Sequence, residues 1–426
     1  MDAPAVTTET PKNPPADETL RSPLPEELIR RDDPFTLPPA LVALAERSPV
    51  ARSTLRSGDP FWLVSGYDEA RAVLSDPRFS ANRFEYHPRF KNLAEHIRER
   101  MREDKQRAGS FINMDPPEHS RYRKLLTGQF TVRRMRQLES RIEEIVADRL
   151  DALLAQGNTA DLVPDFALQV PSMVICELLG VRYEDRAEFQ SRTAMLLRLN
   201  MPGNEAVKFA DDLREFMQRL VTDKRKNPTN DILSGLIHHS GADPALTDDE
   251  LVNMANLLLI AGSETTANML ALGTFVLLRR PEQLALLRED PSRMGDAVEE
   301  LLRFLSIVHV GVLRFPKEDL EFGGEQIPAG STVVISLLAA NRDEQHWPDP
   351  GVLDVTRTRS PHLAFGHGVH QCLGQQLARV EMRVGYTELL RRLPNLRLAV
   401  PIEEIPLRND MLTYGVHSLP VAWDAS

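Results

Sequence analysis

The chain has 426 residues, and its 51 lysines and arginines are outnumbered by 62 aspartates and glutamates, which gives a formal net charge of −11. This acidic balance argues against nucleic acid as a partner. With only two cysteines, Cys176 and Cys372, no disulfide framework is expected, and the composition fits a reducing cytoplasm. Cys176 lies in an apolar run and is expected in the core. Length alone would allow two or three domains, with one large domain as the alternative.

The first residues form a distinct segment. Residues 1–24 are rich in Pro, Thr, Ala and Glu and contain no apolar block. The sequence therefore predicts a disordered tail, with neither a signal peptide nor a membrane anchor, followed by a single folded domain over residues 25–426.

Short elements are expected to follow the tail. Residues 50–55 and 61–64 are predicted strands joined by a turn, and residues 67–74 are a predicted short helix. Segment 80–111 is charged, carries scattered aromatic residues and has weak periodicity, which fits either a substrate-binding loop or a solvated connector.

A helix is predicted to begin at Asp115, which would act as its cap, with prolines in the first turn. In this helix His119 and Arg123 lie four residues apart and so share a face. No acidic residue occurs between Ser120 and Gln137, where basic residues cluster. On so acidic a chain this block is either a docking surface for an acidic protein or ordinary solvated charge.

The middle of the chain is mostly helical by its apolar spacing. Helices are predicted over residues 138–154, 166–179 and 185–199, and residues 201–204 break the pattern. A capping box at residues 247–250 then begins a long apolar helix that is expected to run to Arg280. Glu264, at its centre, argues against a membrane span, because a charge at bilayer depth costs about 3 kcal/mol or more. The helix is therefore expected to pass through the centre of a large domain.

Residues 365–374, with the sequence FGHGVHQCLG, place Cys372 at the mouth of a further predicted helix. Free N–H groups and the helix dipole favour a thiolate there, and a thiolate can bind a metal. Gly366, Gly368 and Gly374 would let the backbone lie flat against a bulky planar group, because they have no Cβ. One soft ligand on a glycine-lined loop suggests haem, although a lone cysteine is more often an inert small hydrophobe.

This string matches, at every fixed position, the haem-ligand loop Phe-Gly-x-Gly-x-His-x-Cys-x-Gly of the cytochrome P450 family. The chain resembles a soluble bacterial member of that family over most of its length. The resemblance implies a mainly α fold with small β-sheets, in which haem b lies between a long central helix and the cysteine loop. It also implies that Cys372 binds the iron and that the same loop supplies further cofactor contacts from Phe365, Gly366, His370 and Gly374.

Residues 261–265, with the sequence AGSET, resemble the oxygen-activating signature of the family. The Thr265 hydroxyl can donate back to the Ala261 carbonyl and loosen that turn, while Gly262 would leave space for dioxygen. Reduction of dioxygen to water consumes protons, so a hydroxyl beside a carboxylate fed by water is a suitable relay. The resemblance implies that Glu264 and Thr265 are the catalytic pair, that Glu264 leads to solvent, and that Ala261 lies at the cofactor.

Three more groups of residues take roles from the resemblance. Glu300 and Arg303 match the Glu-x-x-Arg pair of the family and, with Arg357, would brace the haem loop. The two haem propionates would be held by His119, Arg123, Arg314 and His370. The substrate pocket would be lined by Phe84, Tyr86, Phe111, Leu197, Leu257, Val308, Val310 and Leu412.

The implied activity is that of a haem-thiolate monooxygenase, which inserts one oxygen atom of dioxygen into a lipophilic small molecule and reduces the other to water. Both natural-product tailoring and xenobiotic oxidation fit. Electrons would come from NAD(P)H through a reductase and a ferredoxin or flavodoxin, in the cytoplasm and without a membrane. Two alternatives are a peroxide-driven or coupling haem-thiolate enzyme, against which the Glu264–Thr265 pair counts, and a non-enzymatic ligand carrier in which Cys372 is inert.

Overall fold

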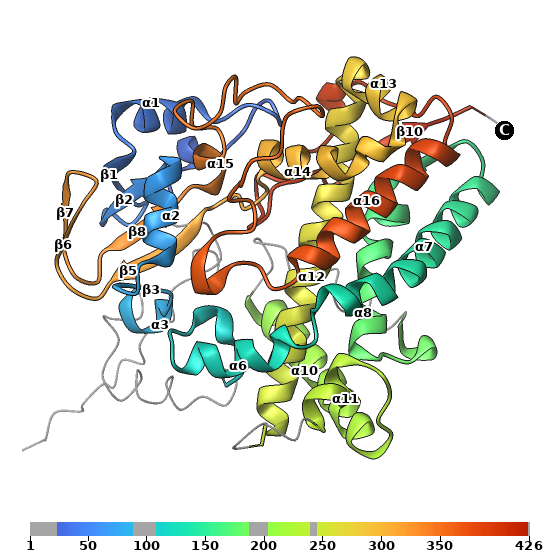
Figure 1. Cartoon of the computed structure of the whole chain (residues 1–426), viewed down its shortest axis with the longest axis horizontal. Coiled ribbons are helices and arrows are strands. Elements are labelled where there is room, and N and C mark those ends of the chain that lie inside the picture. The colour runs from blue at the N-terminus through green and yellow to red at the C-terminus, as the bar shows by residue number, and fades with distance from the viewer. Residues whose placement is uncertain (1–23, 88–107, 187–202, 239–244, 425–426) are drawn as a thin grey trace, which may run out of the picture.

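The computed structural model describes residues 24–87, 108–186, 203–238 and 245–424. Helices fill most of the molecule, and a smaller part built on β-sheet lies at one end, on the left in Figure 1. The main sheet combines strands from residues 50–80 with strands from residues 312–335. The predicted mainly α fold with small sheets is confirmed.

Within the described residues, helices are present where the sequence predicts them, with differences at their ends. Cys176 is fully buried on α8, as expected for a core residue. The bounds are α1 (Pro39–Arg47), α2 (Tyr67–Ser75), α3 (Arg83–Tyr86), α6 (Glu118–Thr127), α7 (Val132–Ala155), α8 (Gln169–Leu179), α10 (Gly203–Lys226), α11 (Ile232–Ile237), α12 (Asp248–Leu278), α13 (Pro281–Glu289), α14 (Met294–Leu305), α15 (Leu337–Ala340) and α16 (Gln375–Arg392).

Within the described part of the chain, three small sheets accompany these helices. The main sheet has the order β1-β2-β8-β5-β3, in which β2 and β8 run parallel and the other neighbours antiparallel. A second sheet has the order β4-β10-β9, and β6 and β7 form a hairpin. The bounds are β1 (Val50–Thr54), β2 (Pro60–Val64), β3 (Phe79–Ser80), β4 (Thr159–Asp161), β5 (Val312–Pro316), β6 (Leu320–Phe322), β7 (Glu325–Ile327), β8 (Thr332–Ile335), β9 (Arg397–Leu398) and β10 (Pro420–Ala422).

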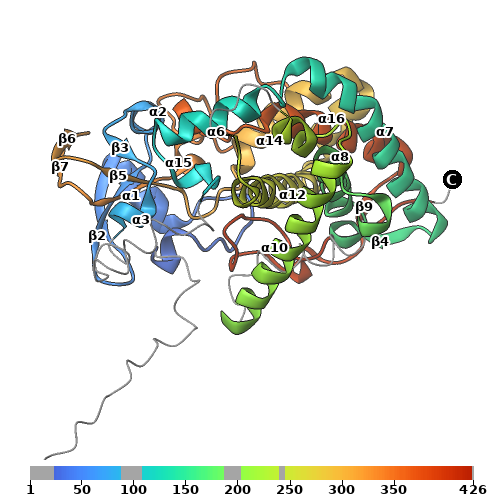
Figure 2. The ribbon, with the colours of Figure 1, turned by 90° about the horizontal axis from the view of Figure 1, so that it is seen from below.

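Helix α12 is the central element of the helical part. Its predicted capping box is present: the Glu250 N–H donates to the Thr247 hydroxyl at 3.2 Å, and the Thr247 N–H donates to the Glu250 carboxylate at 2.7 Å. The helix spans 31 residues and packs against α8, α10 and α16. In Figure 2 it is seen almost end-on, with other helices around it. Among the described residues, no helix is both long enough and apolar enough to cross a bilayer.

Two expectations near the N-terminal half need correction. Asp115 does not cap a helix, because its carboxylate accepts hydrogen bonds from the Ser80 hydroxyl at 2.5 Å and the Ala81 N–H at 2.8 Å. α6 begins only at Glu118 and has no side-chain cap. Leu24, assigned to the disordered tail, is buried and packs beneath the main sheet. Residues 1–23, most of the predicted helix 185–199 and the first half of the predicted break 201–204 lie outside the described residues. The second half of that break, Gly203 and Asn204, belongs to α10.

Candidate active site

The loop that carries Cys372 lies between the sheet part and α16. The Cys372 N–H donates to the Phe365 carbonyl at 2.9 Å, which folds the loop back on itself just before the helix. Burial raises the pKa of the Cys372 thiol, while the Gly374 N–H, which donates to the sulfur, and the charges of Arg123 and Arg379 act to lower it. The thiol therefore lies in an electropositive setting and is half-buried.

The glycines of this loop have two different functions. A Cβ added to Gly366 or Gly374 would meet nothing within 4 Å, so both residues border open space. A Cβ on Gly368 would lie 2.3 Å from the Leu74 carbonyl at the end of α2. The expectation that all three glycines face a planar group is thus wrong for Gly368, whose missing Cβ allows the loop to pack on α2.

Residues 261–265 on α12 make the predicted local hydrogen bond and, in addition, a close contact with α8 that the sequence did not predict. The Thr265 hydroxyl donates to the Ala261 carbonyl at 2.7 Å, as predicted. Ala261 is exposed although it lies in the middle of a helix that is otherwise largely buried, so α12 also borders open space. A Cβ on Gly262 would come within 2.5 Å of Ile175 on α8. The absence of a Cβ at Gly262 therefore allows α12 to pack closely on α8 at this point.

The carboxylate of Glu264 is buried and does not open directly to solvent. It forms an ion pair with Arg408, whose Nη2 lies 2.9 Å from its Oε1, and a hydrogen bond with Thr413. Burial raises the pKa of Glu264 to about 7, against the lowering effect of Arg408. Arg408 is a site residue that the sequence did not reveal, since it lies in an irregular segment far along the chain and belongs to no motif.

The four residues assigned to the propionates converge from three elements. The rings of His119 on α6 and His370 in the cysteine loop have centroids 4.1 Å apart. Burial, together with Arg314, His119 and Arg123, lowers the pKa of His370 to about 3. Arg314 on β5 is buried, and burial lowers its pKa to about 10. Neither ring nitrogen of His119 has a hydrogen-bond partner among the described residues.

These features together provide a test of whether haem fits. A group with two carboxylates would satisfy the orphaned nitrogens of His119 and compensate the buried charge of Arg314. The open space beside Gly366 and Gly374 accommodates a flat ring, and the Cys372 sulfur supplies the soft ligand that iron takes in such a site. The residues present therefore fit haem.

The predicted brace is assembled in full. Arg303 binds both carboxylate oxygens of Glu300, at 2.7 and 2.8 Å, and Arg357 approaches the same carboxylate at 3.2 Å. Arg303 and Arg357 also donate to carbonyls between Asn341 and Val352, in the segment that leads to the cysteine loop.

The residues proposed for the substrate pocket have varied surroundings. Phe111 is buried and tilts towards His119, with ring centroids 6.0 Å apart, whereas Tyr86 stacks on Phe315 at 6.4 Å. Phe84 lies beneath the Arg83 guanidinium. Leu412 is 50% exposed, which is unusual for a large apolar side chain. Leu197 lies outside the described residues.

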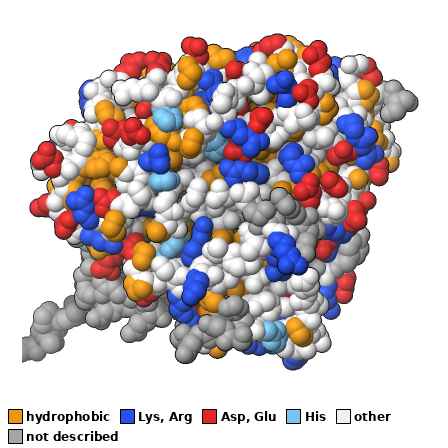
Figure 3. All heavy atoms as spheres, in the orientation of Figure 1, with side chains coloured by type: hydrophobic (Ala, Val, Ile, Leu, Met, Phe, Trp, Pro, Cys, Tyr) orange, Lys and Arg blue, Asp and Glu red, His pale blue; other side chains and the backbone are white. Residues whose placement is uncertain are grey.

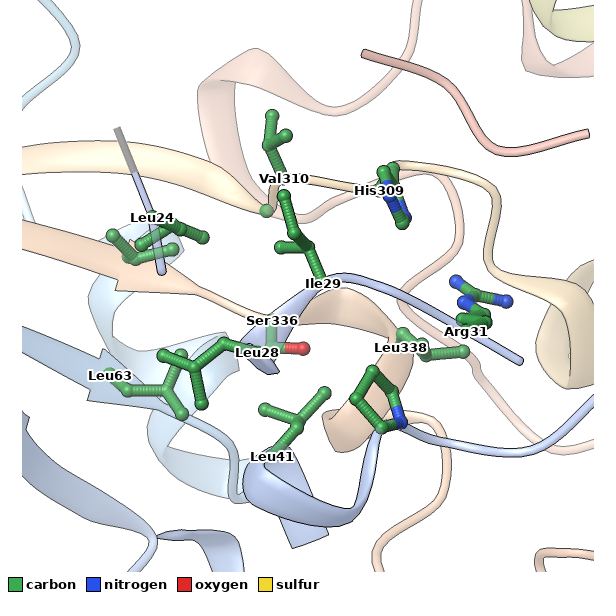
Figure 4. Close-up of a pocket in the computed structure, with 13 residues that line it drawn as sticks. Leu24, Leu28, Ile29, Arg31, Leu41, Leu63, His309, Val310, Ser336 and Leu338 are labelled. Carbon is green, nitrogen blue, oxygen red and sulfur yellow. The ribbon is translucent and has the colours of Figure 1, made fainter. Parts of the chain in front are cut away.

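The three remaining pocket residues are half-buried. Leu257 lies on α12, and Val308 forms a β-bridge with Thr413. Val310 lines a small pocket between the N-terminal segment, α1 and the main sheet, which contains none of the cysteine-loop or α12 residues (Figure 4). This pocket is therefore not the space beside Cys372.

Comparison with known proteins places the chain in a family. The family model for cytochrome P450 matches residues 50–412, and the chain belongs to that family. It binds haem and is a haem-thiolate monooxygenase, with the fold that the sequence predicted.

Several characterised proteins are similar along nearly their whole length. Cytochrome P450 105C1 from Streptomyces sp. is 49% identical over 393 residues, covering 92% of this chain and 97% of the relative. The crystal structure of Rif16 in complex with R-L is 71% identical, with a TM-score of 0.85, and the match covers 94% of this chain and 100% of that one. The structure of CYP105P1 in complex with filipin I is 44% identical, with a TM-score of 0.87, covering 95% and 100%.

Proposed function

We propose that this cytochrome P450 oxidises a lipophilic natural product, with Cys372 as the iron ligand and Glu264 and Thr265 as the proton-delivering pair. The observation that carries the assignment of the ligand is the setting of Cys372, a thiol in a glycine-lined loop beside open space, with the charges of Arg123 and Arg379 acting on its sulfur. The similarity to Rif16, solved with R-L, and to CYP105P1, solved with filipin I, supports a natural-product substrate.

The haem, when bound with a thiolate ligand, supplies the reduction and cleavage of dioxygen. In the overall reaction the substrate, dioxygen, two electrons and two protons give the oxygenated product and one water. The protein must therefore hold the substrate, admit two protons and exclude excess water.

Proton delivery falls to the two polar residues at the centre of α12. The Thr265 hydroxyl is anchored to the Ala261 carbonyl at 2.7 Å, which leaves its oxygen able to accept a further hydrogen bond on the open side of the helix. Glu264 titrates near neutral pH, so it can hold and release a proton under physiological conditions. Such a pair suits a relay from water to the reacting centre.

The remaining assigned residues hold the cofactor. His119, Arg123, Arg314 and His370 would bind the propionates, and Phe365 would pack beside the sulfur. The Arg379 guanidinium lies 4.6 Å from the centroid of the Phe365 ring, which fixes the ring's orientation. Glu300, Arg303 and Arg357 brace the loop and take no part in the chemistry.

The electron donor is proposed to be a ferredoxin or flavodoxin, reduced by an NAD(P)H-dependent reductase in the cytoplasm. On the face seen in Figure 3, basic side chains gather in the middle, over the region where α6, α7 and α16 lie in Figure 1. Lys124 on α6 and Arg133 on α7 are exposed, whereas Arg121 forms an ion pair with Glu250 at 2.6 Å. A basic surface on a chain of net charge −11 would orient an acidic carrier.

Carbon monoxide binding tests the ligand assignment directly. The reduced protein treated with carbon monoxide should show the strongly red-shifted Soret absorption of a thiolate-ligated haem, and Cys372→Ser should abolish that band. The Cys176→Ser variant is the matched control and should retain it. A folded protein whose band is unaffected by Cys372→Ser would refute the assignment. Screening natural products for a spin-state change on binding would then narrow the substrate.

A further inference from the structure

A segment near the C-terminus folds back onto the centre of α12 and engages Glu264. Arg408 donates from Nη2 to the Glu264 carboxylate at 2.9 Å and from Nη1 to the Asn268 side-chain oxygen at 2.7 Å. Asn268 in turn donates to the Thr413 hydroxyl at 3.0 Å, and Thr413 also hydrogen-bonds Glu264. The side chains of Arg408 and Glu264 are only 13% and 5% exposed, so this ion pair is well shielded from solvent.

Arg408 is the one charged group that acts on Glu264 among the described residues. The groups that shift the pKa of Glu264 are burial, Arg408 and the Thr413 hydroxyl, and no second carboxylate or cation contributes. The neighbouring polar groups on α12, Thr265 and Asn268, are uncharged. On the α8 side the helix meets the apolar Ile175. A carboxylate buried in such surroundings would hold its proton firmly unless a cation stabilised the ionised form.

The segment that carries Arg408 packs closely against α12 and is also bonded to other parts of the chain. A Cβ on Gly415 would lie 2.2 Å from the Asn268 side-chain oxygen, so the close approach of the segment to α12 requires glycine at this position. Figure 4 shows Arg31 and His309, two of the residues to which the segment is anchored. The attachments are a β-bridge from Thr413 to Val308 and hydrogen bonds from His309 to Leu412, from Tyr414 to Ile307, and in both directions between Asn409 and the Arg31 backbone.

We propose that Arg408 is the positioning residue for Glu264, holding its carboxyl in place and keeping it able to alternate between its protonated and ionised forms, so that Arg408 sets the pH range of proton delivery. This inference rests on the proposed role of Glu264 in the relay. Without Arg408 the buried carboxyl stays protonated at neutral pH, and it can give up its proton only when the solution is more alkaline. With Arg408, the opposing effects of burial and the ion pair bring the pKa of Glu264 to about 7.

The test is an infrared pH titration of the resting haem-loaded enzyme, which needs no turnover. The C=O stretch of the protonated Glu264 carboxyl is identified by its absence in Glu264→Gln. In Arg408→Met the midpoint of this band should rise by about 1–3 pH units, the usual effect of removing an opposite charge at this distance. Arg408→Lys, which keeps the charge, should remain near the wild-type midpoint. Arg408→Gln provides the same test should the Met variant fail to fold.

Arg397→Met serves as the matched control, because Arg397 is exposed and pairs with Asp424 at the surface. It should leave the midpoint unchanged. The pH profile of coupling, measured as product formed per NAD(P)H consumed, should move upwards in parallel with the midpoint in Arg408→Met. If the midpoint does not move in Arg408→Met while Glu264→Gln loses coupling, the role of Arg408 is overturned and the proposed relay stands. Unchanged coupling in Glu264→Gln overturns the proposed relay, and the role of Arg408 with it.

Discussion

Arg303 binds both carboxylate oxygens of Glu300 on the same face of α14, with side chains that are only 1% and 3% exposed. The pair is three residues apart and so lies on one helix face. Arg303 also donates to the Asn341 and Pro350 carbonyls at 2.9 and 3.0 Å. These hydrogen bonds tie the pair to the segment that leads to Cys372.

Removal of this buried cation should therefore destabilise the protein strongly. In Arg303→Met the Glu300 carboxylate loses its two-point partner within the core, and such a loss costs about 3–5 kcal/mol. We expect less folded protein and reduced haem content, measured by denaturant unfolding and by haem absorbance per polypeptide. The comparison is Arg391→Met, because Arg391 is exposed and pairs with the half-buried Glu388; this variant should cost less than about 1 kcal/mol. Equal losses in the two variants would contradict the bracing role.

Two glycine variants should separate cofactor space from protein packing. Gly374→Val places a side chain in the open space beside Cys372 at an ordinary φ of −84°, so the haem-free protein should keep its stability while haem retention falls. Gly368→Ala instead strains a residue at φ 71° and meets the Leu74 carbonyl, so it should destabilise the protein with or without haem. Unfolding of both haem-free variants and haem titration measure this. A haem affinity unaffected by Gly374→Val would count against the proposed position of the ring.

Loss of the Thr265 hydroxyl should uncouple electron flow from product formation. General acid–base groups contribute about 10²–10⁴-fold to the step they assist, so Thr265→Ala should divert much of the consumed NAD(P)H to hydrogen peroxide. Thr265→Ser keeps the donor to the Ala261 carbonyl and should stay close to the parent. Peroxide released per NAD(P)H oxidised is the measurement. Full coupling in the Ala variant would contradict the role of the Thr265 hydroxyl in proton delivery.

A buried carboxyl on α16 should make stability depend on pH. Glu381 is almost fully buried, its Oε2 has no hydrogen-bond partner among the described residues, and burial raises its pKa to about 8. In the unfolded chain the pKa lies near 4.5, so the folded state binds the extra proton between these values. The stabilisation is complete below about pH 4.5 and is lost as the pH rises through about 8.

The test is the difference in unfolding free energy between the parent and Glu381→Gln across this range. The parent should lose up to about 1.4 kcal/mol per pH unit relative to the variant, because glutamine does not titrate. Asp151→Asn, at an exposed surface position, is the control and should leave the pH profile unchanged. Parallel profiles for Glu381→Gln and the parent would show that Glu381 does not titrate in this range.

Much of the site could be predicted from local patterns in the sequence. The ten residues around Cys372, the Thr265 hydroxyl bonded to the Ala261 carbonyl, the capping box of α12 and the Glu300–Arg303 pair all follow from spacing along one helix or one loop. In each case the interacting groups are separated by only a few residues, so that backbone geometry alone brings them together.

Other features depend on contacts between distant segments, which spacing does not encode. Asp115 resembles a helix cap, but its carboxylate accepts hydrogen bonds from Ser80 of β3 and from the following residue, Ala81. The sequence did not indicate that Ile175 of α8 packs against Gly262. The sequence by itself determined the family, the cofactor and the chemistry, because these rest on short motifs. Only the tertiary structure decided which cation faces Glu264, because the ion pair with Arg408 joins two segments that meet only after the chain has folded.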